Sequence, residues 1–193
     1  SNWSVTGANL TSLDEGTLDV TANLDDEAGN SATAAATTTV KDTVAPNLAI
    51  VSAPTVNSIN VTSYSFTGTC DENGGSVQWS IDDDGNGATA AITGSTTCDG
   101  SNWSQTSVNL SALDEGTLSL TADLDDSYAN SATQASASPT KNTTAPSLNL
   151  NTPVAANASS ASSYAISGLC DVNTATVEWS IDDQNGGTTA VSG

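Results

Sequence analysis

The amino-acid sequence repeats itself at an offset of 100 residues. A fixed period close to the length of one small domain indicates tandem domains. The chain of 193 residues therefore holds slightly less than two periods. Close to half of the overlapping positions are identical, and the matched segments include SNWS at 1 and 101, LDEGTL at 13 and 113, and WSIDD at 79 and 179.

Short segments in which apolar and polar residues alternate predict β-strands, because successive side chains of a strand point to opposite faces. Turn-forming clusters such as DENGG and LDEG separate these segments, and no segment has the periodicity of a helix. Several short strands in each period predict an all-β fold built as a two-sheet sandwich. The clearest predicted strands are 64–70, 77–81 and 118–124, with their copies at 164–170, 177–181 and 18–24.

The segments KDTVAP and KNTTAP mark the predicted domain boundaries, because each is a polar run that meets a proline before a new strand begins. Residues 46–145 are expected to form one complete domain. Residues 1–45 match the C-terminal half of that domain, and residues 146–193 match its N-terminal half. Each half on its own would expose sheet edges and an open face of its core.

The composition is strongly acidic, with 22 Asp and Glu against two Lys and Arg, no His, and a formal net charge of −20. Nucleic acid is excluded as a partner, since phosphate contacts need Lys or Arg. No apolar run is long enough for membrane insertion. The usual acid–base and nucleophile pairs are also missing, so the chain is predicted not to be an enzyme.

Several motifs together resemble the bacterial immunoglobulin-like repeats of giant surface adhesins and other long extracellular fibres. These motifs are CDGSNWS at 98–104, LDEGTL at 113–118, DEAGN at 26–30 and KDTVAP at 41–46. The resemblance implies tandem immunoglobulin-like β-sandwiches in a secreted, extracellular or cell-surface protein. The second copy departs from the pattern, because it lacks the glycine at 129 and has Asn142 where the first has Asp42.

The cysteines suggest one disulfide within the complete domain. In a sandwich of this strand order, Cys70 ends the second strand and Cys98 precedes the strand that contains Trp103, so both fall at the same end. A disulfide suits an oxidising compartment, and two free buried thiols are the alternative. Cys170 matches Cys70, and its expected partner lies outside this chain.

Carboxylates are predicted to gather at the domain junction. Immunoglobulin topology places Asp42 of the linker, Asp71 and Glu72 of one loop, and Asp125 and Asp126 of another at the same end. Calcium binds oxygen ligands in irregular geometry, and interdomain calcium is what the family resemblance implies. These five residues are therefore candidate Ca²⁺ ligands, and solvated loop acids are the alternative.

A second, weaker calcium motif lies in DDDGNG at the opposite end of the domain. Asp82, Asp84 and Asn86 match the first half of a D-x-D-x-N-G loop, but Thr93 stands where the last ligand should be Glu.

The lysines and tryptophans receive ordinary structural interpretations. Lys41 and Lys141 precede linkers and are expected to be exposed, with an intramolecular isopeptide bond as the less favoured alternative. Four tryptophans, at 3, 79, 103 and 179, lie in predicted strands and are expected to pack in cores, with sugar stacking as the alternative.

The predicted function is that of a structural repeat in an extracellular bacterial fibre or adhesin stalk. Copies of the chain would join head-to-tail, and each half domain would be completed by a neighbouring copy. These copies are either separate subunits or repeats of one continuous polypeptide. The alternative is a binding module whose repeated weak sites hold a glycan, ice or a receptor by avidity, with host or surface glycans as partners.

Overall fold

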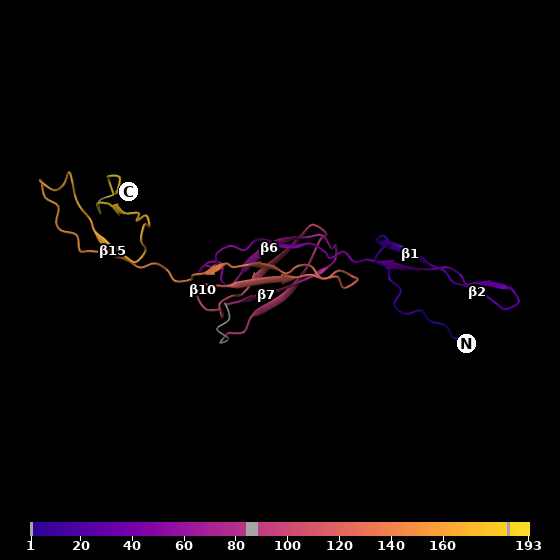
Figure 1. Cartoon of the computed structure of the whole chain (residues 1–193). Coiled ribbons are helices and arrows are strands. Elements are labelled where there is room, and N and C mark those ends of the chain that lie inside the picture. The colour runs from indigo at the N-terminus through magenta and orange to yellow at the C-terminus, as the bar shows by residue number, and fades with distance from the viewer. Residues whose placement is uncertain (1, 84–88, 185) are drawn as a thin grey trace. The chain divides into compact units, whose positions relative to one another are not determined.

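The computed structural model describes residues 2–83, 89–184 and 186–193, and all the regular structure in these ranges is β (Figure 1). The all-β prediction is confirmed. The described ranges contain no helix that is long and apolar enough to cross a membrane. In chain order the strands are β1 (Gly16–Val20), β2 (Asn23–Asp25), β3 (Ser31–Thr33), β4 (Thr37–Lys41), β5 (Leu48–Ser52), β6 (Tyr64–Cys70), β7 (Ser76–Asp82), β8 (Ile92–Thr97), β9 (Asn102–Val108), β10 (Gly116–Thr117), β11 (Ser119–Asp123), β12 (Ala135–Ala137), β13 (Thr140–Lys141), β14 (Leu148–Leu150), β15 (Gly168–Cys170), β16 (Ser180–Ile181) and β17 (Val191–Ser192).

The chain separates into two compact units, Ser1–Thr143 and Thr144–Gly193. The break falls inside the predicted linker KNTTAP. The predicted boundary after residue 45 does not separate two units. Side-chain hydrogen bonds cross it, since Asn130 Nδ2 donates to Asp42 O at 3.2 Å.

The strands from β5 onward in the first unit form a sandwich of two sheets. One sheet has the strand order β12-β11-β7-β8 and the other has the order β5-β6-β9. The outward residues of β6 are exposed and its inward residues are buried, in strict alternation from Tyr64 to Cys70. The ring of Phe66 lies 5.3 Å from that of Trp79 and 5.9 Å from that of Trp103, edge-to-face in both cases. Aromatic contacts thus join the two sheets across the core.

Both halves of the repeat supply the core of this sandwich. Burying these side chains removes apolar surface from water, which is the main stabilising term for the fold. Each half contributes strands to both sheets, since β5 and β6 join β9 in one sheet and β7 and β8 join β11 and β12 in the other. The buried apolar residues are Val56, Tyr64, Phe66, Cys70, Val77, Trp79 and Ile81 from the first half, and Cys98, Trp103, Val108, Leu110, Leu113, Leu118, Leu120, Ala122 and Leu124 from the second.

The two ends of β6 define the two poles of the sandwich. At the first pole, next to Cys70, the chain begins β5, because Leu48 pairs with Cys70. At the second pole, next to Tyr64, the phenol donates to Pro54 O at 2.7 Å, and Val56 forms a parallel bridge with Lys141. Burial raises the pKa of the Tyr64 phenol to about 12, so it remains a donor at any ordinary pH. The chain therefore starts the sandwich at the first pole and leaves it at the second.

Residues 2–45 have the same strand pairing as their copy, residues 102–145, but their apolar side chains are not buried. Gly16 of β1 pairs with Lys41 of β4, as Gly116 pairs with Lys141. Trp3, however, is 75% exposed, whereas its copy Trp103 is 2% exposed. Core packing is therefore the correct interpretation of Trp79 and Trp103, but it is wrong for Trp3 and for Trp179, which is 38% exposed. These two rings lack the strands of the other half of the repeat, which contact their copies.

The second unit, taken by itself, also keeps its local pairing. Leu148 pairs with Cys170, as Leu48 pairs with Cys70. The predicted strands at 164–170 and 177–181 are reduced to their last residues, which form β15 and β16. The reason is the missing neighbours, since β6 pairs with strands on both sides whereas β15 pairs with β14 alone. An apolar groove lies between these short strands, lined among others by Leu150, Tyr164, Ile166, Val177, Trp179 and Ile181.

The alignment of the two copies needs a gap of one residue near the C-terminus. Ile81 pairs with Ile92, 11 residues later, whereas Ile181 pairs with Val191, 10 residues later. The hairpin between β16 and β17 is thus one residue shorter than its counterpart between β7 and β8. Gly193 therefore occupies the place of Gly94 against the tryptophan of the preceding strand, one position earlier than an offset of 100 would put it.

A glycine on β6 allows a tryptophan to pack against the backbone. Trp103 Nε1 donates to Ala49 O at 3.1 Å, and a Cβ added at Gly68 would lie 2.0 Å from that oxygen and 2.3 Å from Nε1. Gly68→Ala should therefore displace the indole and lower the free energy of unfolding by about 1–3 kcal/mol, the usual cost of overpacking. Urea unfolding followed by tryptophan fluorescence measures this loss. Ser65→Ala on the exposed face of β6 is the matched control and should change stability by less than about 0.5 kcal/mol.

Candidate functional site

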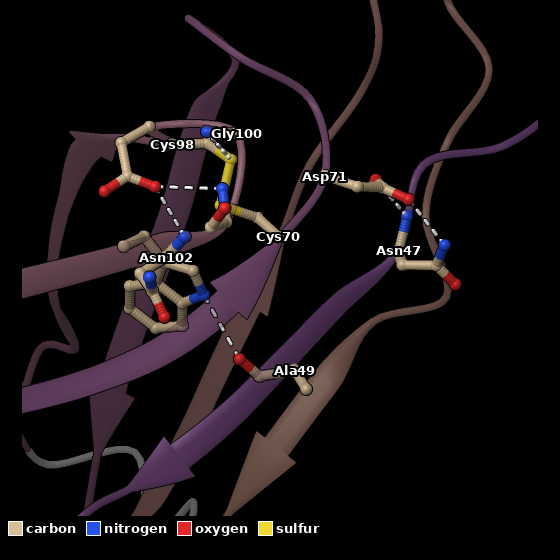
Figure 2. Close-up of a disulfide and its surroundings, with 10 residues drawn as sticks. Asn47, Ala49, Cys70, Asp71, Cys98, Gly100 and Asn102 are labelled. Carbon is tan, nitrogen blue, oxygen red and sulfur yellow. Dashed lines mark hydrogen bonds between the residues drawn. A yellow bond between two sulfur atoms is a disulfide. The ribbon is translucent and has the colours of Figure 1, made fainter.

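The disulfide at the first pole joins the two halves of the repeat covalently. Cys70 ends β6 and Cys98 follows β8, and their sulfur atoms are bonded (Figure 2). The predicted Cys70–Cys98 pair is therefore present. Around it, Cys98 N donates to Gly75 O at 2.8 Å, and Gly74 N donates to Cys98 O at 2.9 Å. Cys170 is an exposed free thiol in the structure, and its pairing with a cysteine outside this chain stays a prediction.

The disulfide should make a large contribution to the stability of the sandwich. It links residues 28 positions apart, and closing a loop of this length stabilises by about 3–4 kcal/mol on the chain-entropy estimate. We expect reduction, or the double change Cys70→Ala with Cys98→Ala, to lower the unfolding free energy by that amount. Denaturant unfolding with and without a thiol reductant measures it. Cys170→Ser is the control, and an equal midpoint for the oxidised and reduced protein would contradict the expectation.

The SNWS motif follows the second cysteine through a tight turn held by Asp99. Its carboxylate accepts hydrogen bonds from Asn102 N at 2.6 Å and Ser101 N at 2.9 Å. These two backbone donors hold the pKa of Asp99 below its usual value of 3.8. Gly100, between them, has φ of 88°, a left-handed conformation that favours glycine. The turn thus directs Asn102 into β9 and Trp103 into the core.

Because the folded-state pKa of Asp99 is lowered, its carboxylate stabilises the fold above pH 3.8 and stops doing so as the pH falls through the folded-state value. Asp99→Ala should therefore lower the Tm at neutral pH, and the difference from wild type should close as the pH falls through the lowered folded-state pKa of Asp99. Thermal melts across this pH range test the expectation. Glu72→Ala is the control at the same pole, and a Tm difference for Asp99→Ala that persists in acid would contradict the assignment.

The first pole also carries the residues predicted to bind calcium at the linker. Asp71 Oδ1 accepts from Asn47 N at 2.7 Å, and Asp71 Oδ2 accepts from Asn47 Nδ2 at 2.5 Å (Figure 2). These hydrogen bonds, led by the one from the Asn47 side chain, lower the pKa of Asp71. Asp42 uses its carboxylate for Val44 N at 3.1 Å. Both aspartates therefore hold the backbone of the linker.

Asp126 holds the turn between β11 and β12. Its Oδ1 accepts from Tyr128 N and Asn130 N, both at 2.8 Å, and its Oδ2 accepts from Asn130 Nδ2 at 2.7 Å. The same turn occurs one period earlier around Asp26, where Gly29 has φ of 84°. Ala129 replaces that glycine and still adopts φ of 67°, so the side-chain hydrogen bonds impose a conformation that alanine disfavours.

The structure does not assemble the predicted linker calcium site from Asp42, Asp71, Glu72, Asp125 and Asp126. Among the residues described, no three acidic or cysteine side chains converge in a way that could hold a metal ion. The carboxylates of Asp71 and Asp126 instead accept hydrogen bonds from Asn47 and Asn130. Calcium binding at this pole stays a prediction.

The weaker motif at the opposite pole falls largely outside the described residues, since Asp84 and Asn86 lie in the range 84–88. Asp82 ends β7 and uses its carboxylate for Asp83 N at 2.9 Å. Asp83 in turn accepts from Asp114 N at 2.9 Å, a contact that lowers its pKa. These contacts bring Asp82, Asp83 and Asp114 together at the second pole.

The lysine residues are not the exposed side chains that the sequence suggested. Lys141 is 5% exposed, and its Nζ donates to Leu113 O and lies 3.5 Å from Glu115 Oε1. Lys41 is 11% exposed and pairs with Glu15, the residue that matches Glu115. Each lysine is buried because the LDEG turn folds over it and supplies both a carbonyl and a carboxylate.

Two packed antiparallel sheets, with the chain starting at one pole and leaving at the other, define an immunoglobulin-like β-sandwich. Residues 101–187 match the family model of the bacterial Ig-like domain (group 3). The match begins beside β9, crosses the predicted linker and ends in the loop after β16, so it covers parts of two predicted domains. It agrees with the predicted fold class and with the prediction that the chain is not an enzyme. No curated protein matches the chain.

Two solved structures are similar to the chain. A tetra-tandem repeat from the extending region of a large adhesion protein is 25% identical, over 98% of this chain and 48% of that one, with a TM-score of 0.47. A structure concerning the host cell surface retention of a 1.5-MDa bacterial ice-binding adhesin is 15% identical, over 67% of this chain and 43% of that one, with a TM-score of 0.34. The chain thus spans about half the length, or less, of the solved structures it matches.

Proposed function

We propose that this chain is a structural repeat of an extracellular bacterial adhesin stalk or fibre, in which half domains are completed by neighbouring copies. The observation that carries the proposal is the contrast between equivalent residues. Leu24 is 71% exposed where its copy Leu124 is 2% exposed, and Val177 is 45% exposed where its copy Val77 is fully buried. Apolar surface of this kind is stable only when it is covered.

The complete sandwich supports another copy of the repeat as the covering partner. There, β9 and β11 of the segment 101–143 pair with β6 and β7, and more than half of residues 1–43 are identical to their counterparts in that segment. Both uncovered halves already have the strand register of the complete domain. Residues 1–45 of one copy therefore match the groove between β14–β15 and β16–β17 of another. The neighbour is either a second chain or the adjoining repeat of a longer polypeptide, and the matching residues are the same in both cases.

Such a contact is head-to-tail, because residues 1–45 of one copy would bind a different surface, the groove in the second unit, on the next copy. Repetition of a head-to-tail contact produces an open filament unless the rotation between copies closes a ring. A cell-surface location is part of this proposal. It is supported by the match to a bacterial Ig-like domain family and by the disulfide, which suits an oxidising compartment.

The proposal predicts two complementary defects. Leu24→Asp places a charge on the donated half, and Val177→Asp places one in the receiving groove. We expect the unchanged chain to form a concentration-dependent series of oligomers in sedimentation velocity, and each variant alone to remain a monomer. A mixture of the two variants should form dimers and nothing larger, because each variant keeps the surface that the other has lost.

The control for this experiment is Ser65→Asp, which adds the same charge to an exposed position of β6 and should leave the oligomer series unchanged. An unchanged chain that stays monomeric at every concentration would contradict the completion of half domains. Intact-mass measurement of the denatured native material then separates the two kinds of neighbour. A mass near 19.2 kDa indicates separate subunits, and a much larger one indicates a continuous polypeptide.

A further inference from the structure

The linker at residues 42–47 is held at its upstream end by the LDEG turn. Glu15 Oε2 accepts from Thr43 N at 2.9 Å, and Glu15 Oε1 accepts from Thr43 Oγ1 at 2.7 Å. Lys41 Nζ contacts the same carboxylate and also donates to Leu13 O at 2.9 Å. The first residues of the linker are thus bound to the strand pair that precedes them.

The downstream end is held by two loops of the sandwich. Asp71 receives both the backbone and the side-chain N–H groups of Asn47, and Asn130 donates to the backbone oxygen of Asp42. Between these anchors Pro46 is buried, and its ring fixes φ of that residue. Hydrogen bonds therefore restrain both ends of a segment only six residues long.

We propose that this linker is a joint built from hydrogen bonds to the chain's own carboxylate and amide side chains, and that it is ordered without a bound cation. The carboxylates of Glu15 and Asp71 accept charge-assisted hydrogen bonds from N–H groups of the linker. These hydrogen bonds take the place of carboxylate contacts to a metal ion. The inference concerns the linker alone and does not depend on the proposed function.

The same arrangement recurs in the residues around the next linker, each unit considered by itself. In the first unit, Glu115 accepts from Thr143 N at 2.8 Å and from Thr143 Oγ1. In the second unit, Asp171 accepts from Ser147 N at 2.9 Å. Glu115 and Asp171 are the copies of Glu15 and Asp71, so the sequence repeats the anchors together with the linker.

A cation bound through Asp71 or Asp126 would share carboxylate oxygens that already accept hydrogen bonds from Asn47 and Asn130. These contacts are present without a cation. Two further candidate ligands, Glu72 and Asp125, accept no hydrogen bond from residues 42–47 within the described structure. They therefore serve as matched controls, since they would be ligands in a calcium site but form no hydrogen bond with the linker.

The test is amide hydrogen exchange in the full chain, followed by NMR in the presence of either a chelator or millimolar calcium. The amides of Thr43 and Asn47 should exchange slowly, at rates that are the same in the two conditions. Asp71→Ala should accelerate exchange at Asn47 by about tenfold or more, and Glu15→Ala should do the same at Thr43, the effect expected for loss of a hydrogen bond to a charged group. Asp71→Asn, which keeps one acceptor oxygen, should restore part of the protection.

Glu72→Gln and Asp125→Asn should leave both amides unchanged in either condition. The amide of Phe66 reports whether the sandwich is folded in each variant, and Glu15 lies outside the sandwich, so Glu15→Ala remains informative even if Asp71→Ala unfolds it. The proposal is overturned if calcium slows exchange at Thr43 or Asn47 and either control variant abolishes that effect. It is equally overturned if Glu15→Ala leaves Thr43 protected. Neither outcome changes the result expected from sedimentation velocity. The proposal on the linker and the proposal on half-domain completion can therefore be disproved independently.

Discussion

A closed core in this chain requires the strands before and after the second cysteine to combine in two shared sheets. Phe66 is enclosed because Trp79 comes from its own half of the repeat and Trp103 comes from the other half. Pairing within each half does not require this closure, since both uncovered halves keep the register of the complete domain. Backbone pairing is therefore a local property of each half, whereas burial belongs to the two halves together.

Much of the fold could be predicted from the sequence for the same reason. Alternation at 64–70 and 77–81 marks β6 and β7 within a residue, because their inward positions are buried in the complete sandwich. The same alternation fails at 164–170, where most of the segment is not strand. Periodicity reports which residues can be buried, and it carries no information on whether the neighbouring strands of the other half are present to bury them.

The candidate site was harder to predict, because the acidic residues can be read from the sequence but their hydrogen-bond partners are distant in it. Asp71 faces Asn47, which is 24 residues away, and Lys141 lies against a carbonyl 28 residues earlier. One signal was available, since the spacing of Asp126 and Asn130 also occurs at Asp26 and Asn30. An aspartate and an asparagine at that spacing, repeated in both copies, indicate a side-chain-held turn more directly than a metal ligand.

The position of the disulfide has a consequence for a chain that is pulled from its two ends. Cys70 and Cys98 lie 28 residues apart in sequence and 6.0 Å apart in space. If tension opens the sandwich, the segment between them stays a closed loop and adds almost nothing to the stretched length. At about 3.4 Å for each extended residue, roughly 90 Å of chain is withheld from every unfolded domain. A tether made of such repeats would lengthen by smaller steps than its residue number suggests, and reducing agents would lengthen each step.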